Sequence, residues 1–198
     1  LEAAGYEVDL QYANNDVATQ VSQIENMILN EVQVLVVASI DGSALGTVLA
    51  KAKKAGIPII AYDRLLTDTE AVDYYTTFDN YKVGQIQGQY VVDKFDLANT
   101  DKTYTIEFTG GSPDDNNAGL FFAGAFDTVK PYIDAGTLVA LSGQYEKAVV
   151  ATPGWATDAA QARFENILAS FYADAPLHAV LASNDSTALG VANALESS

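Results

Sequence analysis

The sequence predicts an α/β protein made of two lobes, each with a parallel sheet covered by helices. Short apolar segments rich in β-branched residues alternate with amphipathic segments along the chain. Segment 32–40 (VQVLVVASI) is a continuous apolar run, which is typical of a parallel strand buried on both faces. After a polar connection at 98–102 the alternation begins again. Strands that alternate with helices imply parallel sheets with right-handed crossovers.

The strand pattern occurs in seven segments, most of them bounded by turn or cap residues. The expected strands are 6–12, 32–40, 57–61, 74–78, 104–108, 138–141 and 177–182. Pro58 stands near the start of its strand, where a missing N–H is best tolerated.

Helices are expected where apolar residues recur at helical spacing behind an Asp or Asn that can cap the first turn. The expected helices follow 14–16, 41–43, 79–80, 114–117 and 158, and a last helix starts at Ser186. Pro131 is expected to bend or shorten the last turns of its helix. The polar connection divides the chain into an N-terminal lobe, 1–101, and a C-terminal lobe, 102–198.

Composition narrows the possible functions. The formal net charge is −16 and the chain has only two arginines, so no basic surface exists for a nucleic acid backbone. The chain has no cysteine and one histidine, which removes Cys-ligated zinc, disulfides and a His-rich metal site. No run approaches the roughly 20 apolar residues of a membrane span. We therefore expect no metal and no cofactor, while the composition suits an exported or a cytosolic protein equally.

Three polar clusters come after three expected strands: 62–64 (YDR), 114–117 (DDNN) and 184–185 (ND). In parallel sheets, ligands bind outside the carboxyl ends of the strands. Two facing lobes could therefore enclose one small ligand between these clusters. A guanidinium, carboxylates and amides together suit a neutral polyhydroxylated ligand, because each can pair with adjacent hydroxyls.

Each candidate residue also has a simpler explanation. Arg64 could be a surface arginine paired with Asp68 or Glu70, although its place at a strand end favours a ligand contact. Trp155, the only tryptophan, could stack on the apolar face of a sugar or fill a gap between a loop and a helix.

The acidic and amide residues could be helix caps. Asp115 and Asn117 lie in a cluster with more capping residues than one helix start needs, so at least one is surplus. In the pair Asn184 and Asp185, one residue could cap while the other faces the ligand. Arg163 lies in the middle of an expected helix, and we expect its side chain to be solvated.

Four stretches together resemble the periplasmic sugar-binding proteins of ABC importers, which have the type I fold. The stretches are IPIIAYDRLL, DYYTTFDNYKVGQIQGQY, GGSPDDNNAGLFFAGAFDTVKPYIDAG and LASNDSTALG. The nearest branch is that of the xylose-binding and multiple-sugar-binding receptors. The resemblance covers nearly the whole chain and implies two lobes, joined by a three-stranded hinge, that close on a monosaccharide.

The resemblance also implies the contacts and the setting. The sugar-contacting residues would be Arg64, Asp115, Asn117, Trp155 and Asn184. Arg64 would reach the sugar from the first lobe, and Trp155 would stack on its ring. The implied protein is a monomer that presents its sugar to the permease subunits of an ABC transporter. It would be periplasmic, or an extracellular lipoprotein in a host without an outer membrane.

Members of this family begin with a strand and a helix ahead of LEAAGYEVDL and continue about a hundred residues beyond Leu195. By the resemblance we therefore expect this chain to be partial, without the first strand and the C-terminal part.

Two other function classes remain open. Effector domains of transcription regulators share the fold and the sugar chemistry, but they carry a basic DNA-binding headpiece. An enzyme could hold Mg²⁺ with Asp63, Asp114 and Asp115, yet it would need a phosphate grip that Gly110 and Gly111, followed by acidic residues, do not provide.

Overall fold

The computed structural model describes residues 1–198, which form two compact units, Leu1–Thr77 and Phe78–Ser198. Both units contain a parallel sheet flanked by helices, which confirms the predicted α/β fold class. The units divide before α3 (Asn80–Lys94), not at the polar connection 98–102. The reason for this difference is that α3 packs along α4 (Asn116–Asp134) of the second unit.

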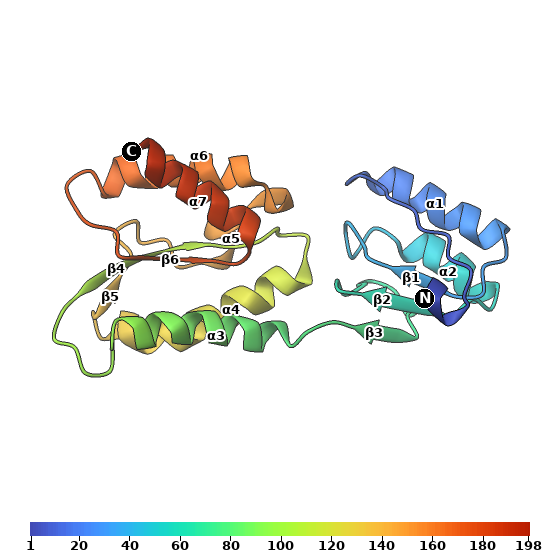
Figure 1. Ribbon diagram of the computed structural model, residues 1–198, viewed down its shortest axis with the longest axis horizontal. Helices are drawn as coiled ribbons and strands as arrows, with labels where there is room; N and C mark the ends of the chain where they lie inside the picture. The colour runs from blue at the N-terminus through green and yellow to red at the C-terminus, as the bar shows by residue number, and fades with distance from the viewer. The chain divides into compact units, whose positions relative to one another are not determined.

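The first unit has a three-stranded sheet in the order β1-β2-β3. Its elements are η1 (Glu2–Ala4), α1 (Val17–Leu29), β1 (Leu35–Val37), α2 (Gly46–Lys54), β2 (Ile59–Tyr62) and β3 (Tyr74–Thr76). Both α1 and α2 lie over the same face of this sheet (Figure 1). Leu35 and Val37 of β1 are buried in the core beside these helices, whereas Val36 between them is exposed.

Some expected elements of the first unit differ from the structure. Residues 6–12 form no strand, and Tyr6, Leu10 and Tyr12 are exposed. No neighbouring strand pairs with this segment, and short alternating sequences need such pairing to hold an extended conformation. The helix expected behind Asp41 begins at Gly46, because the Asp41 carboxylate instead accepts the Ser43 N–H in a local turn.

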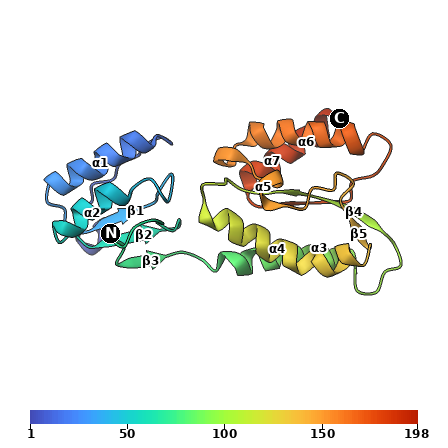
Figure 2. The ribbon, with the colours of Figure 1, turned by 180° about the vertical axis from the view of Figure 1, so that it is seen from behind.

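The second unit has a parallel sheet in the order β5-β4-β6. Besides α3 and α4, its elements are β4 (Tyr104–Thr109), β5 (Leu138–Val139), α5 (Lys147–Val150), η2 (Pro153–Trp155), α6 (Thr157–Phe171), β6 (Ala179–Ala182) and α7 (Asp185–Ser197). Figures 1 and 2 show α3 and α4 on one face of this sheet and α6 and α7 on the other. The central strand β4 is therefore covered on both sides.

Three glycines allow α3 and α4 to approach closely. A Cβ on Gly84 would lie 2.1 Å from the backbone oxygen of Phe121, and one on Gly124 would lie 2.0 Å from that of Tyr81. Gly88 faces α4 in the same way. The helix α4 continues through Pro131 to Asp134, so the expected shortening at this proline does not occur.

Candidate functional site

The candidate site is built on the carboxyl edge of the β5-β4-β6 sheet. Thr109 pairs with Ala182 in parallel register, so the turn after β4 and the turn after β6 leave from the same edge. The turn after β4 is fixed by the segment ahead of α6. The Gly110 N–H donates to Val150 O over 2.8 Å, and the Thr152 N–H donates to Gly111 O over 3.0 Å.

Within the acidic turn, burial alternates from one residue to the next. Asp115 and Asn117 are only 5% and 3% exposed, whereas Asp114 and Asn116 are exposed. Asp115 caps α4, because its Oδ1 accepts the Asn117 N–H over 2.9 Å. Its Oδ2 accepts the indole Nε1–H of Trp155 over 3.1 Å. The capping explanation therefore holds for Asp115, and its contact with a sugar remains a prediction.

Trp155 is held tightly by its surroundings. Its φ is 56°, a left-handed conformation that a bulky residue rarely adopts, and Gly154 before it has φ 62°. The ring lies over Gly111, where a Cβ would come within 2.0 Å of the indole. Phe121 of α4 meets the indole edge-on, with ring centroids 6.3 Å apart. The half-buried indole thus forms a wall beside the Asp115 carboxylate.

Arg64 lies in the first unit, just after β2, and is partly buried. Its Nη1 donates to Ile40 O over 2.6 Å, in the segment that follows β1. The side chain of Gln20 braces the same segment by bonding the backbone of Ala38 and Ile40. The guanidinium is therefore anchored where two parallel strands end, as the sequence predicts for a ligand contact.

Asn184 is the N-cap of α7. Its Oδ1 accepts the Thr187 N–H over 2.9 Å and the Thr187 hydroxyl over 2.9 Å, and the two residues form a capping box. Ser183, directly before it, donates its N–H to Thr109 O, so Asn184 follows the same sheet edge as the acidic turn. Of the pair Asn184 and Asp185, the asparagine is the cap. Its sugar contact remains a prediction.

Hydrogen bonds join Asp115, Asn117 and Trp155 into one cluster. Sequence reasoning missed a fourth member, Asn80, whose Nδ2 donates to Asn117 Oδ1 over 2.9 Å. The available signal was that Asp79 and Asn80 supply two capping residues for one helix start. Asp79 performs the capping, because its carboxylate accepts the Lys82 N–H.

A buried polar network supports the strand that leads to the site. Glu107 of β4 is fully buried and accepts hydrogen bonds from the Ser142 N–H and hydroxyl and from the Tyr172 hydroxyl. Burial raises the pKa of Tyr172 above its ordinary range, and the hydrogen bond to Glu107 is the second cause of the increase. The network therefore keeps the phenol protonated beside the carboxylate.

Arg163 belongs to the same region and differs from the expectation of a solvated side chain. Its Nη1 donates to Phe108 O over 2.9 Å, and its Nη2 donates to the side chain of Gln144. Burial lowers the pKa of Arg163, while the negative charge of Glu107 opposes this effect. The expectation was wrong because α6 packs against the sheet at this position and directs the guanidinium inward.

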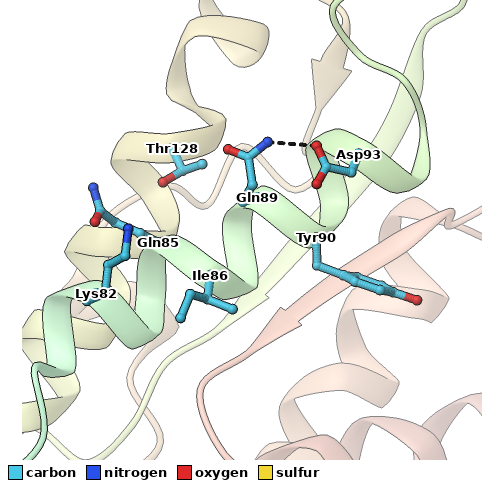
Figure 3. A pocket seen from close by; sticks show the side chains of 7 residues that line it. All are labelled: Lys82, Gln85, Ile86, Gln89, Tyr90, Asp93 and Thr128. Carbon is cyan, nitrogen blue, oxygen red and sulfur yellow. Dashed lines mark hydrogen bonds between the residues drawn. The ribbon is translucent and has the colours of Figure 1, made fainter.

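An open groove of about 380 Å³ runs along α3, but none of the five predicted residues lines it. Figure 3 shows its lining, in which Gln89 donates a hydrogen bond to Asp93. Its lining residues are Lys82, Gln85, Ile86, Gln89, Tyr90, Asp93 and Thr128. Across the chain, His, Asp and Glu side chains form no group of three that could hold a metal ion. No helix combines the length and apolar character that a membrane crossing requires.

Comparison with known proteins assigns the family. The family described as "Periplasmic binding protein domain" matches residues 1–198. The chain belongs to this family. The multiple sugar-binding periplasmic receptor ChvE of Rhizobium radiobacter is 48% identical to this periplasmic binding protein domain over 196 residues, which are 99% of the chain and 55% of the receptor. The D-xylose-binding periplasmic protein of Escherichia coli (strain K12) is 41% identical over 98% of the chain and 54% of its own length.

Solved structures give the same result. An ABC transporter solute-binding protein from Clostridium phytofermentans with bound β-D-glucose has a TM-score of 0.97 and 58% identity, covering 100% of the chain and 61% of that protein. A carbohydrate transporter solute-binding protein from Chloroflexus aurantiacus, in complex with D-glucose, has a TM-score of 0.87 and 32% identity, covering 100% and 62%. The chain thus spans little more than half the length of the relatives that it matches. These relatives are named as sugar-binding or solute-binding proteins, which does not favour the transcription-regulator alternative.

Proposed function

We propose that this periplasmic binding protein domain belongs to a monosaccharide receptor. The receptor captures an aldopentose or aldohexose, such as xylose or glucose, and delivers it to the permease subunits of an ABC transporter. One observation carries the proposal: a buried carboxylate, Asp115, joins the backbone of Asn117 to the indole of Trp155 at the carboxyl edge of a parallel sheet.

The chemistry of this cluster suits a sugar. Each oxygen of a carboxylate has a second lone pair, so Asp115 can accept a further hydrogen bond from a hydroxyl. An amide such as that of Asn117 offers both a donor and an acceptor. The face of the Trp155 ring can cover the C–H side of a pyranose and exclude water from the adjacent hydrogen bonds.

The relatives support this assignment. A receptor 48% identical to the chain is named for binding multiple sugars, and a structure 58% identical holds β-D-glucose. We propose Arg64, Asp115, Asn117, Trp155 and Asn184 as the sugar contacts. We further propose a monomer without cofactor or catalytic activity, located in the periplasm or anchored outside the cell as a lipoprotein.

Calorimetry of the full-length protein with a panel of pentoses, hexoses and polyols tests the proposal. At least one aldose is expected to bind, and Arg64→Ala and Asp115→Ala are each expected to weaken it by about tenfold to hundredfold, the range for a buried charged hydrogen bond. Asp114→Ala, which changes the exposed neighbour of Asp115, serves as the control. Absence of binding across the whole panel would overturn the function, and unchanged affinity in both variants would remove these residues from the site.

A further inference from the structure

Asn80 and Asn117 form a buried pair of amides at the starts of two adjacent helices. Asn80 is the first residue of α3 and Asn117 the second residue of α4. The two residues are 4% and 3% exposed, and the bond from Asn80 Nδ2 to Asn117 Oδ1 is 2.9 Å long. Figure 1 shows that the two helices run side by side.

Capping does not explain the presence of Asn80. The N-cap of α3 is Asp79, which already accepts the Lys82 N–H over 2.9 Å. Burial of an amide costs free energy unless its polar atoms are paired, so a buried Asn is usually retained for the bond it makes. The glycine-mediated contact of α3 with α4 brings the Asn80 amide within reach of Asn117.

We propose that Asn80 is a positioning residue that sets the specificity of the sugar site. The inference rests on the proposed function, in which Asn117 contacts the sugar. The Asn80 amino group holds the Asn117 oxygen toward α3, so the amino group of Asn117 is the end turned away from Asn80. Asn117 is thereby set to act as a hydrogen-bond donor to a sugar oxygen, and its amide is prevented from rotating to present an acceptor.

The substitution Asn80→Asp reverses this arrangement with almost no change in size. The new carboxylate can only accept hydrogen bonds, so the Asn117 amide is expected to rotate and donate to it. Asn117 then presents its oxygen to the ligand. A ring oxygen that formerly accepted a bond then meets an acceptor, which leaves buried polar groups unpaired and weakens binding by about tenfold or more. A hydroxyl that formerly accepted must instead turn and donate, at the expense of its other hydrogen bonds.

The decisive measurement is the order of affinities for glucose, xylose, their epimers and single deoxy sugars, determined by calorimetry on the full-length protein. We expect Asn80→Asp to change this order, whereas loss of a merely structural bond would weaken all sugars by the same factor. In an Asn117→Ala background, Asn80→Asp is expected to change affinity by less than about twofold. Gln87→Glu, half-exposed on the same helix, controls for the added negative charge.

Each result has a defined meaning. If the unaltered protein binds a sugar and Asn80→Asp leaves both affinity and order unchanged, the inference fails while the proposed function stands. If the unaltered protein binds no sugar, the proposed function fails and the inference falls with it. Should Asn80→Asp not fold, Asn80→Ala removes the donor without adding a charge. Asn80→Ala is expected to bring the affinities for sugars that offer an acceptor to Asn117 closer to the affinities for sugars that do not. An unchanged ratio of these affinities would overturn the proposal.

Discussion

The indole of Trp155 and the carboxylate of Asp115 are joined by a hydrogen bond of 3.1 Å, although the two residues lie 40 positions apart. The other oxygen of the same carboxylate caps α4. Asp115 therefore fixes both the start of a helix and the position of the single tryptophan. Any ligand that contacts Asp115 should alter the surroundings of Trp155, which makes tryptophan fluorescence a direct report of the candidate site.

Asp115→Asn should weaken sugar binding by about tenfold or more, with the overall fold retained. An asparagine has one acceptor and one donor at its tip, so either the Asn117 N–H or the Trp155 indole N–H loses its partner. Trp155 emission is expected to move to longer wavelength as water gains access to the indole. Asp114→Asn, at the exposed neighbouring position, should change neither emission nor affinity. If the two variants had the same Trp155 emission and the same sugar affinity, the role given to Asp115 would be wrong.

Gly111→Ala should displace the indole. The new methyl group would lie 2.0 Å from the Trp155 ring, which is far below van der Waals contact. Because the ring is also confined by Phe121, it must rotate or the turn must shift. We expect a changed near-ultraviolet circular dichroism of Trp155 and weaker sugar binding. An unchanged tryptophan signal would show that the ring does not lie against this glycine in solution.

Gly124→Ala should destabilise the second unit by about 1–3 kcal/mol, as overpacking does in well-packed interiors. The added Cβ would lie 2.0 Å from Tyr81 O, a backbone atom of α3 that cannot move independently. Gly119→Ala is the matched control on α4, because its Cβ meets only the end of the Lys147 side chain. That variant should gain up to about 1 kcal/mol from the helix propensity of alanine. Urea unfolding of both variants would reveal the difference, and equal stabilities would refute close packing of α3 on α4.

Tyr172→Phe should reduce the loss of stability at alkaline pH. The folded-state pKa of Tyr172 is raised above its ordinary value of 10.0, so the hydroxyl stays protonated in the folded protein where it ionises in the unfolded chain. Its contribution to the free energy of unfolding is therefore complete below pH 10.0 and is lost as the pH rises toward the folded-state pKa.

Urea unfolding of both proteins, measured below and above pH 10.0, checks the prediction. Tyr90→Phe, which removes an exposed hydroxyl, is the control. If Tyr172→Phe and the unaltered protein show the same alkaline slope, the buried hydroxyl does not contribute to it.

Local patterns in the amino-acid sequence were enough to predict most of the order of the elements and the places where polar residues follow the strands. The hydrophobic period, the turn residues and the helix caps each depend on residues only a few positions apart, so they can be recognised in a single sequence. This reasoning found β4, a helix start within 114–117 and the α/β class. It placed a strand at 6–12 because period alone cannot show whether a partner strand pairs with a segment.

The polar residues that contact one another could be identified only in the folded chain. It showed that Asp115 and Asn117 are buried while Asp114 and Asn116 are not, and it brought Asn80 against Asn117. It also placed α3 in the second unit. The contact between Asn80 and Asn117 and the place of α3 depend on how closely α3 approaches α4. Glycines at distant positions on the two helices together control this approach. Contacts of that kind leave no periodic signal in the sequence, because each partner taken alone looks like an ordinary cap or a small helical residue.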